Sequence, residues 1–442
     1  MKSTLSDGFR HGLRALSHRN YKLFFSGQSI SVIGTWMTRI ATSWLVYRLT
    51  GSAALLGLVS FAGQVPTFIF APFAGVWVDR LNTHRVLVVT QTLAMVQSFV
   101  LAALTLLHII HVWEILVLQS CQGFINAFDT PARQSFAIQM VERKEDLSSA
   151  IALNSSMVNM ARLIGPSAAG IIIAAVGEGY CFLIDGISYM AVIASLLAMT
   201  IQVRQRAGGF QHESALADLK QGWSYVSSFT PIRSILLMIA LMSFMGMPYT
   251  VLMPIFAGSI LHGGSHTLGF LIGVSGVGAL IGALFLAMRK SVLGLGRVIP
   301  LAAATFGVGL IIFANSRTMW LSMVLMLATG YGMMTQLASS NTILQTIVDD
   351  DKRGRVMSYY TMAFQGMAPF GSLMAGEVAA RIGAPATLTF SGACCVTGAL
   401  LFALSLPNLR RLVRPIYVGM GIMPEIATGL QTASALQTPP ED

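Results

Sequence analysis

The sequence predicts an all-α membrane protein with twelve transmembrane helices in two six-helix bundles and both termini in the cytoplasm. Charged residues make up 10% of its 442 residues and hydrophobic residues 54%, whereas ordinary soluble domains hold about 25% and 45–50%. So few polar groups cannot cover a surface that faces water. Lipid must therefore surround most of the chain.

Apolar windows long enough to cross a bilayer define the twelve helices. A span needs roughly 20 apolar residues, and its backbone groups must find partners within the segment, which favours helices. The alternating pattern of a transmembrane barrel is absent. The windows cover residues 23–47, 53–78, 86–107, 112–132, 149–175, 181–201, 233–257, 267–288, 298–315, 319–343, 357–382 and 386–406.

The longest polar stretch inside the chain divides these windows six and six, and so it sets the predicted domains. Residues 1–22 form a cytoplasmic segment with a short interfacial helix, because Phe9, Leu13 and Leu16 share one helical face. The domains that follow are an N-terminal bundle at 23–202, a linker at 203–232, a C-terminal bundle at 233–406 and a cytoplasmic tail at 407–442.

The linker is expected to hold an amphipathic helix on the inner membrane face, because Leu216, Leu219, Trp223 and Val226 recur at helical spacing. Most of the 28 Lys and Arg residues fall in the loops on the same side as the termini. By the positive-inside rule that side is cytoplasmic. The net charge of +10 is thus a topology signal, and it gives no reason to expect a nucleic-acid partner.

Weak internal similarity relates the two halves. Gly75 and Gly282 are 207 residues apart, each near the inner end of the second span of its half. Gly170 and Gly376 begin similar stretches at an offset of 206. Two parallel repeats of six helices would place a substrate between the halves, near the middle of the membrane.

Several motifs resemble the major facilitator superfamily. "GVWVDRLNTHR", with Gly75, Asp79, Arg80 and Arg85, resembles its loop signature G-x-x-x-D-R-x-x-x-x-R. "GFINAFDTPARQSFAIQMV" at 123–141 and "RGRVMS" at 353–358 are similar to the branch that includes the enterobactin exporter and related drug and siderophore efflux proteins. The resemblance runs from about residue 17 to 425 and implies the major facilitator fold.

A second signature lies in the predicted fifth span. Arg162, Gly165, Pro166 and Gly170 partly match the family's antiporter-type motif, although Ala169 replaces the first glycine of its closing pair and a glycine further upstream is missing. The match implies export coupled to inward proton flow.

The resemblance also implies a gating network at the inner ends of the helices. Gly75, Asp79, Arg80 and Arg85 would meet Asp129 and Arg133, and would latch the halves together while the protein faces outward. Charges near the headgroups can exchange partners between conformations, as a gate requires. The alternative is a static anchor that fixes topology.

Polar stripes on several spans predict a water-filled cavity, because such faces in a lipid-embedded helix point into the bundle. The alternative is hydrogen bonding that holds helices together. The candidate lining residues are Gln28, Thr35, Gln122, Asn126, Asn159, Gln336 and Gln365.

Three charges inside predicted spans are candidates for proton coupling: Glu377 first, Asp185 second, and Arg39. A charge in the bilayer interior costs at least about 2.5–3.5 kcal/mol, so it is normally paired or functional. Each acid could instead be a structural partner for an arginine.

These observations predict a secondary active transporter in a bacterial inner membrane: a proton-coupled exporter of a small, partly apolar organic compound such as a siderophore or drug, working as a monomer. The alternatives are an uptake or facilitated-diffusion carrier, and a sensor or scaffold that transports nothing. No phosphate-binding loop, H-E-x-x-H or G-x-S-x-G motif occurs, so we expect no enzyme activity. The four cysteines fall in apolar segments, and we expect no metal or cofactor.

Overall fold

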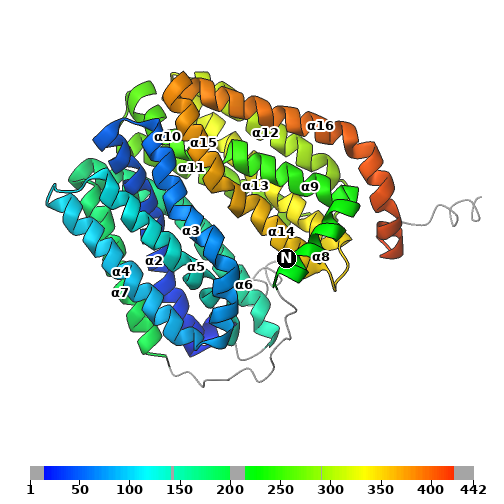
Figure 1. Ribbon diagram of the computed structural model, residues 1–442, viewed down its shortest axis with the longest axis horizontal. Coiled ribbons are helices and arrows are strands. Elements are labelled where there is room, and N and C mark those ends of the chain that lie inside the picture. Colours follow the sequence, from blue (N-terminus) through cyan, green and yellow to red (C-terminus); the bar gives the residue numbers. More distant parts are fainter. Residues whose placement is uncertain (1–13, 141–143, 200–214, 290, 423–442) are drawn as a thin grey trace, which may run out of the picture.

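The computed structural model describes residues 14–140, 144–199, 215–289 and 291–422, and every regular element in these ranges is helical (Figure 1). The first half contains α2 (Arg19–Thr50), α3 (Ala53–Arg80), α4 (Thr83–Leu106), α5 (Val112–Gln139), α6 (Leu147–Val176) and α7 (Glu178–Leu197). The second half contains α9 (Thr230–Leu241), α10 (Tyr249–Ile255), α11 (Ser265–Ala287), α12 (Leu295–Asn315), α13 (Met319–Ile347), α14 (Arg353–Thr361), α15 (Met367–Ile382) and α16 (Ala384–Gly419). Between the halves lies α8 (Ala215–Ser228).

Two long helical segments of the second half are interrupted by π-helical turns. Met242–Gly246 and Phe256–Ile260 flank α10, and Met362–Gly366 joins α14 to α15. Short 3₁₀ turns at Arg14–Ser17 and Lys144–Asp146 precede α2 and α6. A π turn loosens the regular hydrogen-bond ladder, and such turns often mark functional positions.

Within the described part of the chain, nine helical segments are long and apolar enough to cross a membrane. The protein is therefore a multi-pass membrane protein. The long segments outside this set are α2, α5 and the α14–α15 pair. Polar or charged side chains along these segments lower their mean hydropathy, and α2 alone carries Gln28, Ser31, Thr35, Arg39 and Thr42.

Polar residues at the predicted breaks fix where several helices begin. Ser52 accepts a hydrogen bond from the backbone N–H of Leu55 at the start of α3, and Asn82 does the same for Arg85 at the start of α4. These side chains satisfy N–H groups that have no partner inside the helix. The polar pair Asn82–Thr83 therefore ends one long apolar segment and starts the next.

The two halves carry matching glycines, as the offset of 206 predicts. Gly177 separates α6 from α7 with φ of 94°, and Gly383 separates α15 from α16 with φ of 87°. Only glycine adopts this backbone region without strain. Similar sharp turns thus join the last two spans of each half.

The halves touch through α3 with α15 and α6 with α11. A Cβ on Gly57 would lie 2.9 Å from the Cα of Gly376, and a Cβ on Gly170 would lie 3.1 Å from the Cα of Gly269. The Ser265 hydroxyl also donates to the Gly170 carbonyl at 3.1 Å. Small residues let the backbones approach closely, as is usual between helices in a membrane.

These contacts correct the predicted correspondence of Gly75 with Gly282. Gly57 pairs with Gly376 as Gly269 pairs with Gly170, so α3 and α11 correspond at an offset of 212 rather than 207. In that register Gly75 corresponds to Ala287. The segments between helices differ in length between the halves, and so no single offset holds throughout.

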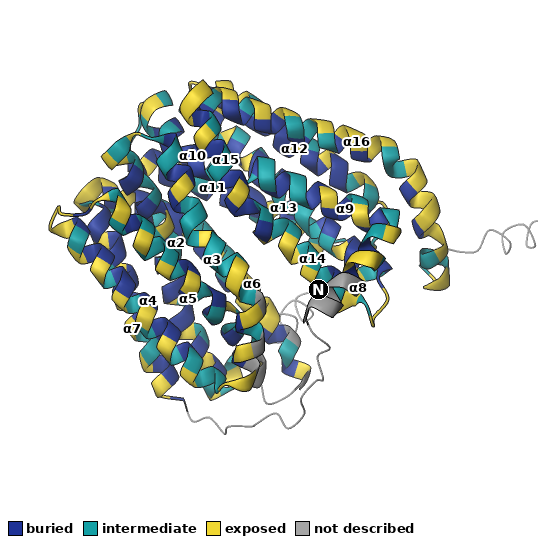
Figure 2. Ribbon diagram, in the orientation of Figure 1, coloured by how far each residue is buried: buried dark blue, intermediate teal, exposed yellow. Residues whose placement is uncertain are grey.

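At the opposite end the halves diverge, toward the start of α6 and toward α8 and α14 (Figure 1). Buried residues lie mainly inside each group of helices (Figure 2). Polar side chains near the diverging ends are exposed on both halves: Asn154, Ser155 and Ser156 on α6, and Ser358, Thr361 and Gln365 on α14 and the following π turn. The halves are therefore closed at the Gly57 end and open at the other.

The chain's polar segments lie partly outside the described residues, and the described parts add two observations to the sequence-based prediction. The predicted N-terminal helix falls mostly on residues 1–13, outside the described residues, as do residues 423–442 of the predicted tail. The last helix, α16, continues to Gly419, past its expected end at 406, because Leu409 and Val413 are buried. In the linker, Trp223 lies 5.9 Å from the Tyr359 ring between centroids, so it contacts α14.

Candidate functional site

Two arginines from different helices lie against one tryptophan in the first half. The guanidinium carbons of Arg39 on α2 and Arg162 on α6 are 5.0 and 5.3 Å from the centroid of Trp36. Gly165 makes this possible, because a Cβ there would lie 2.5 Å from the Trp36 Cβ. The glycine of the antiporter-type motif thus brings α6 onto α2.

Neither arginine pairs with a carboxylate among the described residues. The Nε of Arg162 is buried and has no hydrogen-bond partner. The Arg39 side chain is exposed although Trp36 and Tyr189 lie near it, so its guanidinium group is accessible. The two guanidinium groups are therefore available to another molecule.

Two tyrosines approach this pair from other helices. Tyr189 on α7 lies near Arg39, and its hydroxyl is 3.4 Å from the Thr35 hydroxyl. Tyr249 on α10 interacts electrostatically with Arg162, and its hydroxyl is 3.0 Å from that of Ser275. Because α10 belongs to the second half, the site is built from both halves.

Asp185 on α7 is a buried carboxylate that pairs with no cation of the described residues. Its Oδ2 accepts hydrogen bonds from Thr38 on α2 at 2.8 Å and from Ser98 on α4 at 3.2 Å. Its Oδ1 is buried without a partner, and it lies where a Cβ on Gly34 would be only 2.6 Å away. Three helices and one glycine therefore shape a pocket for a single carboxyl group.

Glu377 has a different setting. It lies near the end of α15, its side chain is 54% exposed, and its Oε1 accepts from Arg381 one turn later at 2.7 Å. An exposed pair of this kind contributes little to stability. The argument that made Glu377 the first coupling candidate was burial, and burial is found at Asp185 instead.

The predicted gating residues are partly brought together. Asp129 on α5 is buried, forms an ion pair with Arg133 of the same helix, and accepts hydrogen bonds from two α4 side chains, Thr90 at 2.9 Å and Gln91 at 2.7 Å. Arg80 and Arg85 are exposed at the α3–α4 turn.

The other two residues of the predicted network, Gly75 and Asp79, lie on α3. Asp79 belongs to the last turn of α3, and its side chain is outside the described part of the structure. Its contact with Asp129 and Arg133 therefore stays a prediction. A Cβ on Gly75 would meet no atom of the described side chains and backbone within 4 Å, so no described residue packs against this glycine in the present conformation.

The predicted lining residues divide by burial. Gln365 is exposed, and Thr35, Gln122, Asn126 and Asn159 are half-buried. Gln28 and Gln336 are instead buried, as expected for polar groups packed between helices. These two do not line an accessible space in this conformation.

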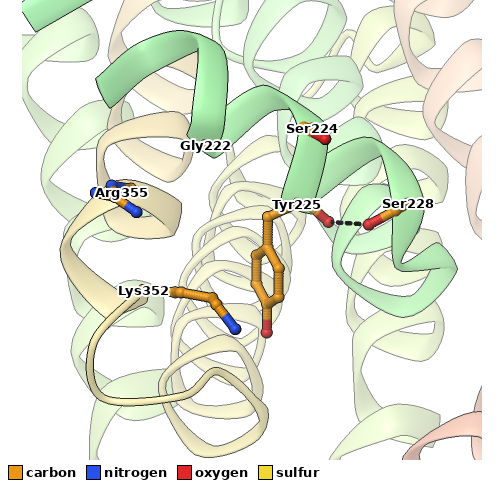
Figure 3. A pocket seen from close by; sticks show the side chains of 6 residues that line it. All are labelled: Gly222, Ser224, Tyr225, Ser228, Lys352 and Arg355. Atoms are coloured by element: carbon orange, nitrogen blue, oxygen red, sulfur yellow. Dashed lines mark hydrogen bonds between the residues drawn. The ribbon is translucent and has the colours of Figure 1, made fainter. Parts of the chain in front are cut away.

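Two hollows lie apart from the arginine pair. An apolar groove of about 460 Å³ between α4 and α5 has Arg85 and Thr90 among its walls. A second hollow of about 330 Å³ lies between α8 and the start of α14 (Figure 3). There the Lys352 ammonium lies 4.8 Å from the centroid of Tyr225, and a hydrogen bond to Asp349 raises the pKa of Lys352. This contact fastens the linker helix to the second half.

Sequence reasoning selected Arg39, Arg162 and Asp185 but missed their neighbours. Trp36, Tyr189 and Tyr249 are ordinary residues in apolar helices, and their contacts depend on how the helices are rotated. One signal was available, because Trp36 adjoins Thr35 in the polar stripe of α2 and is one helical turn from Arg39.

Comparisons with known proteins agree with this architecture. The sequence profile of the transmembrane secretion effector family of the major facilitator superfamily matches residues 11–414. The chain is 26% identical over 388 residues to the staphyloferrin A transporter of Staphylococcus aureus, covering 86% of this chain and 95% of that protein. It is 26% identical over 397 residues to the multidrug efflux pump Tap of Mycolicibacterium fortuitum, covering 86% and 93%.

The fold is also found in solved structures. A mutant of the nucleoside transporter NupG superposes with a TM-score of 0.68 at 14% sequence identity, covering 87% of this chain and 99% of that chain. At this identity the likeness concerns the fold alone. The predicted resemblance is thus confirmed by the family match, and the chain belongs to the transmembrane secretion effector family of the major facilitator superfamily, in its drug and siderophore efflux branch.

Proposed function

We propose that the protein is a proton-coupled exporter that moves a small, partly apolar organic compound, such as a siderophore or a drug, by alternating access. The relatives named above transport compounds of these two kinds. The observation that supports proton coupling is the buried Asp185 carboxylate, which has hydroxyl donors but no cation among the described residues.

An acid in this position suits reversible protonation. An ionised carboxylate inside a membrane protein is costly unless it is paired, and the hydroxyls of Thr38 and Ser98 offset only part of that cost. Proton uptake removes the charge and lets the unpartnered Oδ1 act as a donor. Rocking of the halves would expose this carboxyl to opposite sides in turn.

The proposed topology is twelve spans with both termini in the cytoplasm of a bacterial inner membrane. The α2 helix, the α5 helix and the α14–α15 pair pack among the nine apolar spans and are long enough to cross with them. The basic loops support a cytoplasmic location for the end where the halves diverge. The structure would then be inward-facing, and a monomer contains every group named here.

The gate is proposed to close at that end. Asp79 and Arg80 on α3 would pair with Asp129 and Arg133 on α5 of the same half, and the second half would close against the inner end of α3, where Gly75 would allow close backbone approach. Its open surroundings here are what an inward-facing state requires. At the other end the Tyr47 hydroxyl is 2.6 Å from that of Ser259, and this contact between halves would have to break on opening outward.

Asp185→Asn compared with Glu377→Gln tests the coupling. Wild-type protein in proteoliposomes should accumulate labelled staphyloferrin A, or a drug identified by an efflux panel, against its gradient when a pH difference is imposed. Asp185→Asn should reduce this accumulation to background but retain exchange of cargo without a pH difference. Glu377→Gln should behave as wild type, because that carboxylate is exposed and pairs on its own helix.

Each other outcome selects an alternative. If Glu377→Gln abolishes pH-driven accumulation and Asp185→Asn does not, the coupling carboxylate is Glu377 on α15. Transport that ignores the pH difference would indicate a facilitated-diffusion carrier, and accumulation in the opposite direction would indicate an uptake system. No movement of any panel compound would favour a sensor or scaffold.

A further inference from the structure

We infer that the cargo is an organic anion, held by the guanidinium groups of Arg39 and Arg162, which both lie against Trp36. The inference rests on the proposed transport function, because only a transporter would carry the bound anion as its cargo. The binding site itself does not depend on proton coupling.

Charge balance is the first argument. Arg39 and Arg162 place two cations inside the bundle, and each lies close enough to the other to interact unfavourably. Such charges normally pair or mark a substrate path. The acids buried in the described part are all engaged elsewhere: Asp129 with Arg133, Asp146 with His18, Glu178 with Arg48, and Asp185 with Thr38 and Ser98.

Unsatisfied donors are the second argument. The buried Nε of Arg162 has no partner, and a guanidinium carries five N–H donors in a fixed planar fork. The Arg39 side chain is exposed and is thus reachable by a ligand. A carboxylate or a similar delocalised oxyanion matches this fork through two parallel hydrogen bonds. Both guanidinium carbons lie within 5.3 Å of one ring, so one ligand can reach both.

The position of the site is the third argument. Tyr249 reaches Arg162 from the second half, and the Tyr189 hydroxyl is near Arg39. An anion bound here would contact groups from both halves and neutralise the repulsion between the arginines. A cationic drug would add a third positive charge to the same place. The site therefore favours an acidic compound with two or more oxyanion groups over a cationic one.

The experiment measures thermal stabilisation of the purified full-length protein in lipid nanodiscs, without any ion gradient. The probes are citrate, tricarballylate and phthalate, each beside its neutral amide, with sulfate and tetraethylammonium as simple ions, all at one ionic strength. At least one carboxylate should raise the melting temperature saturably, and more than its amide does. Equal shifts for every acid and its amide, or a shift by sulfate as large as by any carboxylate, would overturn the inference.

Variants assign any effect to the two arginines. Arg39→Gln and Arg162→Gln should each weaken the apparent affinity for the carboxylate by about tenfold or more, since each removes one charged partner of a desolvated contact. Arg162→Lys should recover part of it, as a point charge without the fork. The matched control is Arg317→Gln, which removes one positive charge from an exposed loop and should change nothing.

Unchanged affinity in both glutamine variants would place the anion elsewhere and refute the assignment. If either variant fails to fold, the wild-type comparison of acids with amides still decides the cargo class. Because no gradient is used, loss of proton coupling in the transport assay and loss of anion binding here are separate results.

Discussion

Helix α5 in the first half and helix α13 in the second half are copies of one another with different interiors. They begin at Val112 and Met319, which are 207 residues apart. At that offset the buried Asp129 and the half-buried Arg133 become Gln336 and Ser340. The first is an ion pair over one helical turn, and the second is a hydrogen bond of 3.2 Å over the same turn. The same geometry is thus kept with charge in one half and without it in the other.

The same contrast extends to the other charged positions. At the offset of 206 set by Gly177 and Gly383, Arg162 corresponds to Ala368 and Asp185 to Ser391. Ser391 is fully buried and its hydroxyl has no partner, so even the place of the acid is polar but uncharged.

The second half instead has the π turns found in the described residues, in the segments around α10 and between α14 and α15. Such turns are common places for a helix to bend. The difference teaches that the two halves have diverged: the first has the buried charges, and the second has the π turns among the described residues.

The largest expected effect concerns packing. A Cβ on Gly330 of α13 would overlap the Ser275 carbonyl of α11, whereas a Cβ on its copy Gly123 would lie 2.5 Å from the Gly63 carbonyl. Backbone atoms cannot move aside as a side chain does, so overpacking costs are high here. Gly330→Ala should lower stability by more than about 3 kcal/mol, and Gly123→Ala by less.

Thermal unfolding and the size-exclusion profile of the purified variants measure this difference. Gly354→Ala is the control in the second half, because a Cβ there meets no atom within 4 Å. Equal stability of the Gly330→Ala and Gly354→Ala variants would contradict close backbone packing of α13 against α11.

The all-helical membrane fold was predictable from the sequence, because the features that define it are local. Apolar windows locate the helices, and the stretches repeated at an offset of 206 end at Gly177 and Gly383, where the last turn of each half lies. The register of α11 was not predicted correctly, since insertions between helices change the offset without changing composition. The register follows from the packing of α3 against α15 and of α11 against α6, and a single sequence does not show this packing.

The candidate site was predictable where residue type alone is unusual. Arg39, Arg162 and Asp185 stand out because charges are rare inside spans. Their neighbours could not be predicted, because hydropathy does not show how each helix is rotated about its axis. A tryptophan such as Trp36 also suits a packed core as well as a binding site. Glu377 was ranked first on the expectation of burial; α15 ends at Ile382 as the apolar window predicts, but the Glu377 side chain is 54% exposed, and a single sequence does not show how much of a helix end its neighbours cover.

The next effect concerns the charged pair. Arg133→Ser leaves the Asp129 carboxylate buried with only Thr90 and Gln91 as donors, which should cost about 2–3 kcal/mol. Asp129→Gln combined with Arg133→Ser gives α5 the side-chain pair of α13. The free energy of unfolding of this double variant should lie within about 1 kcal/mol of the wild-type value. A double variant as unstable as the single one would show that α4 requires the charge itself, and that the neutral arrangement of α13 cannot serve in α5.

The smallest effect separates two glycines that the sequence pairs and the structure does not. A Cβ on Gly282 would lie 2.7 Å from the Thr335 hydroxyl and 3.0 Å from the Tyr331 carbonyl, so Gly282→Ala should cost about 1 kcal/mol. Gly75→Ala meets no neighbour and should change stability by less than about 0.5 kcal/mol.

Thermal unfolding of both variants measures the difference in stability, and turnover in proteoliposomes measures the difference in transport rate. If Gly75 is kept for close approach in the outward-facing state, Gly75→Ala should slow transport while leaving the melting temperature unchanged, and Gly282→Ala should lower both in proportion. Equal losses of stability would mean that Gly75 is already packed as Gly282 is. The proposed close approach of the second half at Gly75 would then lose its support.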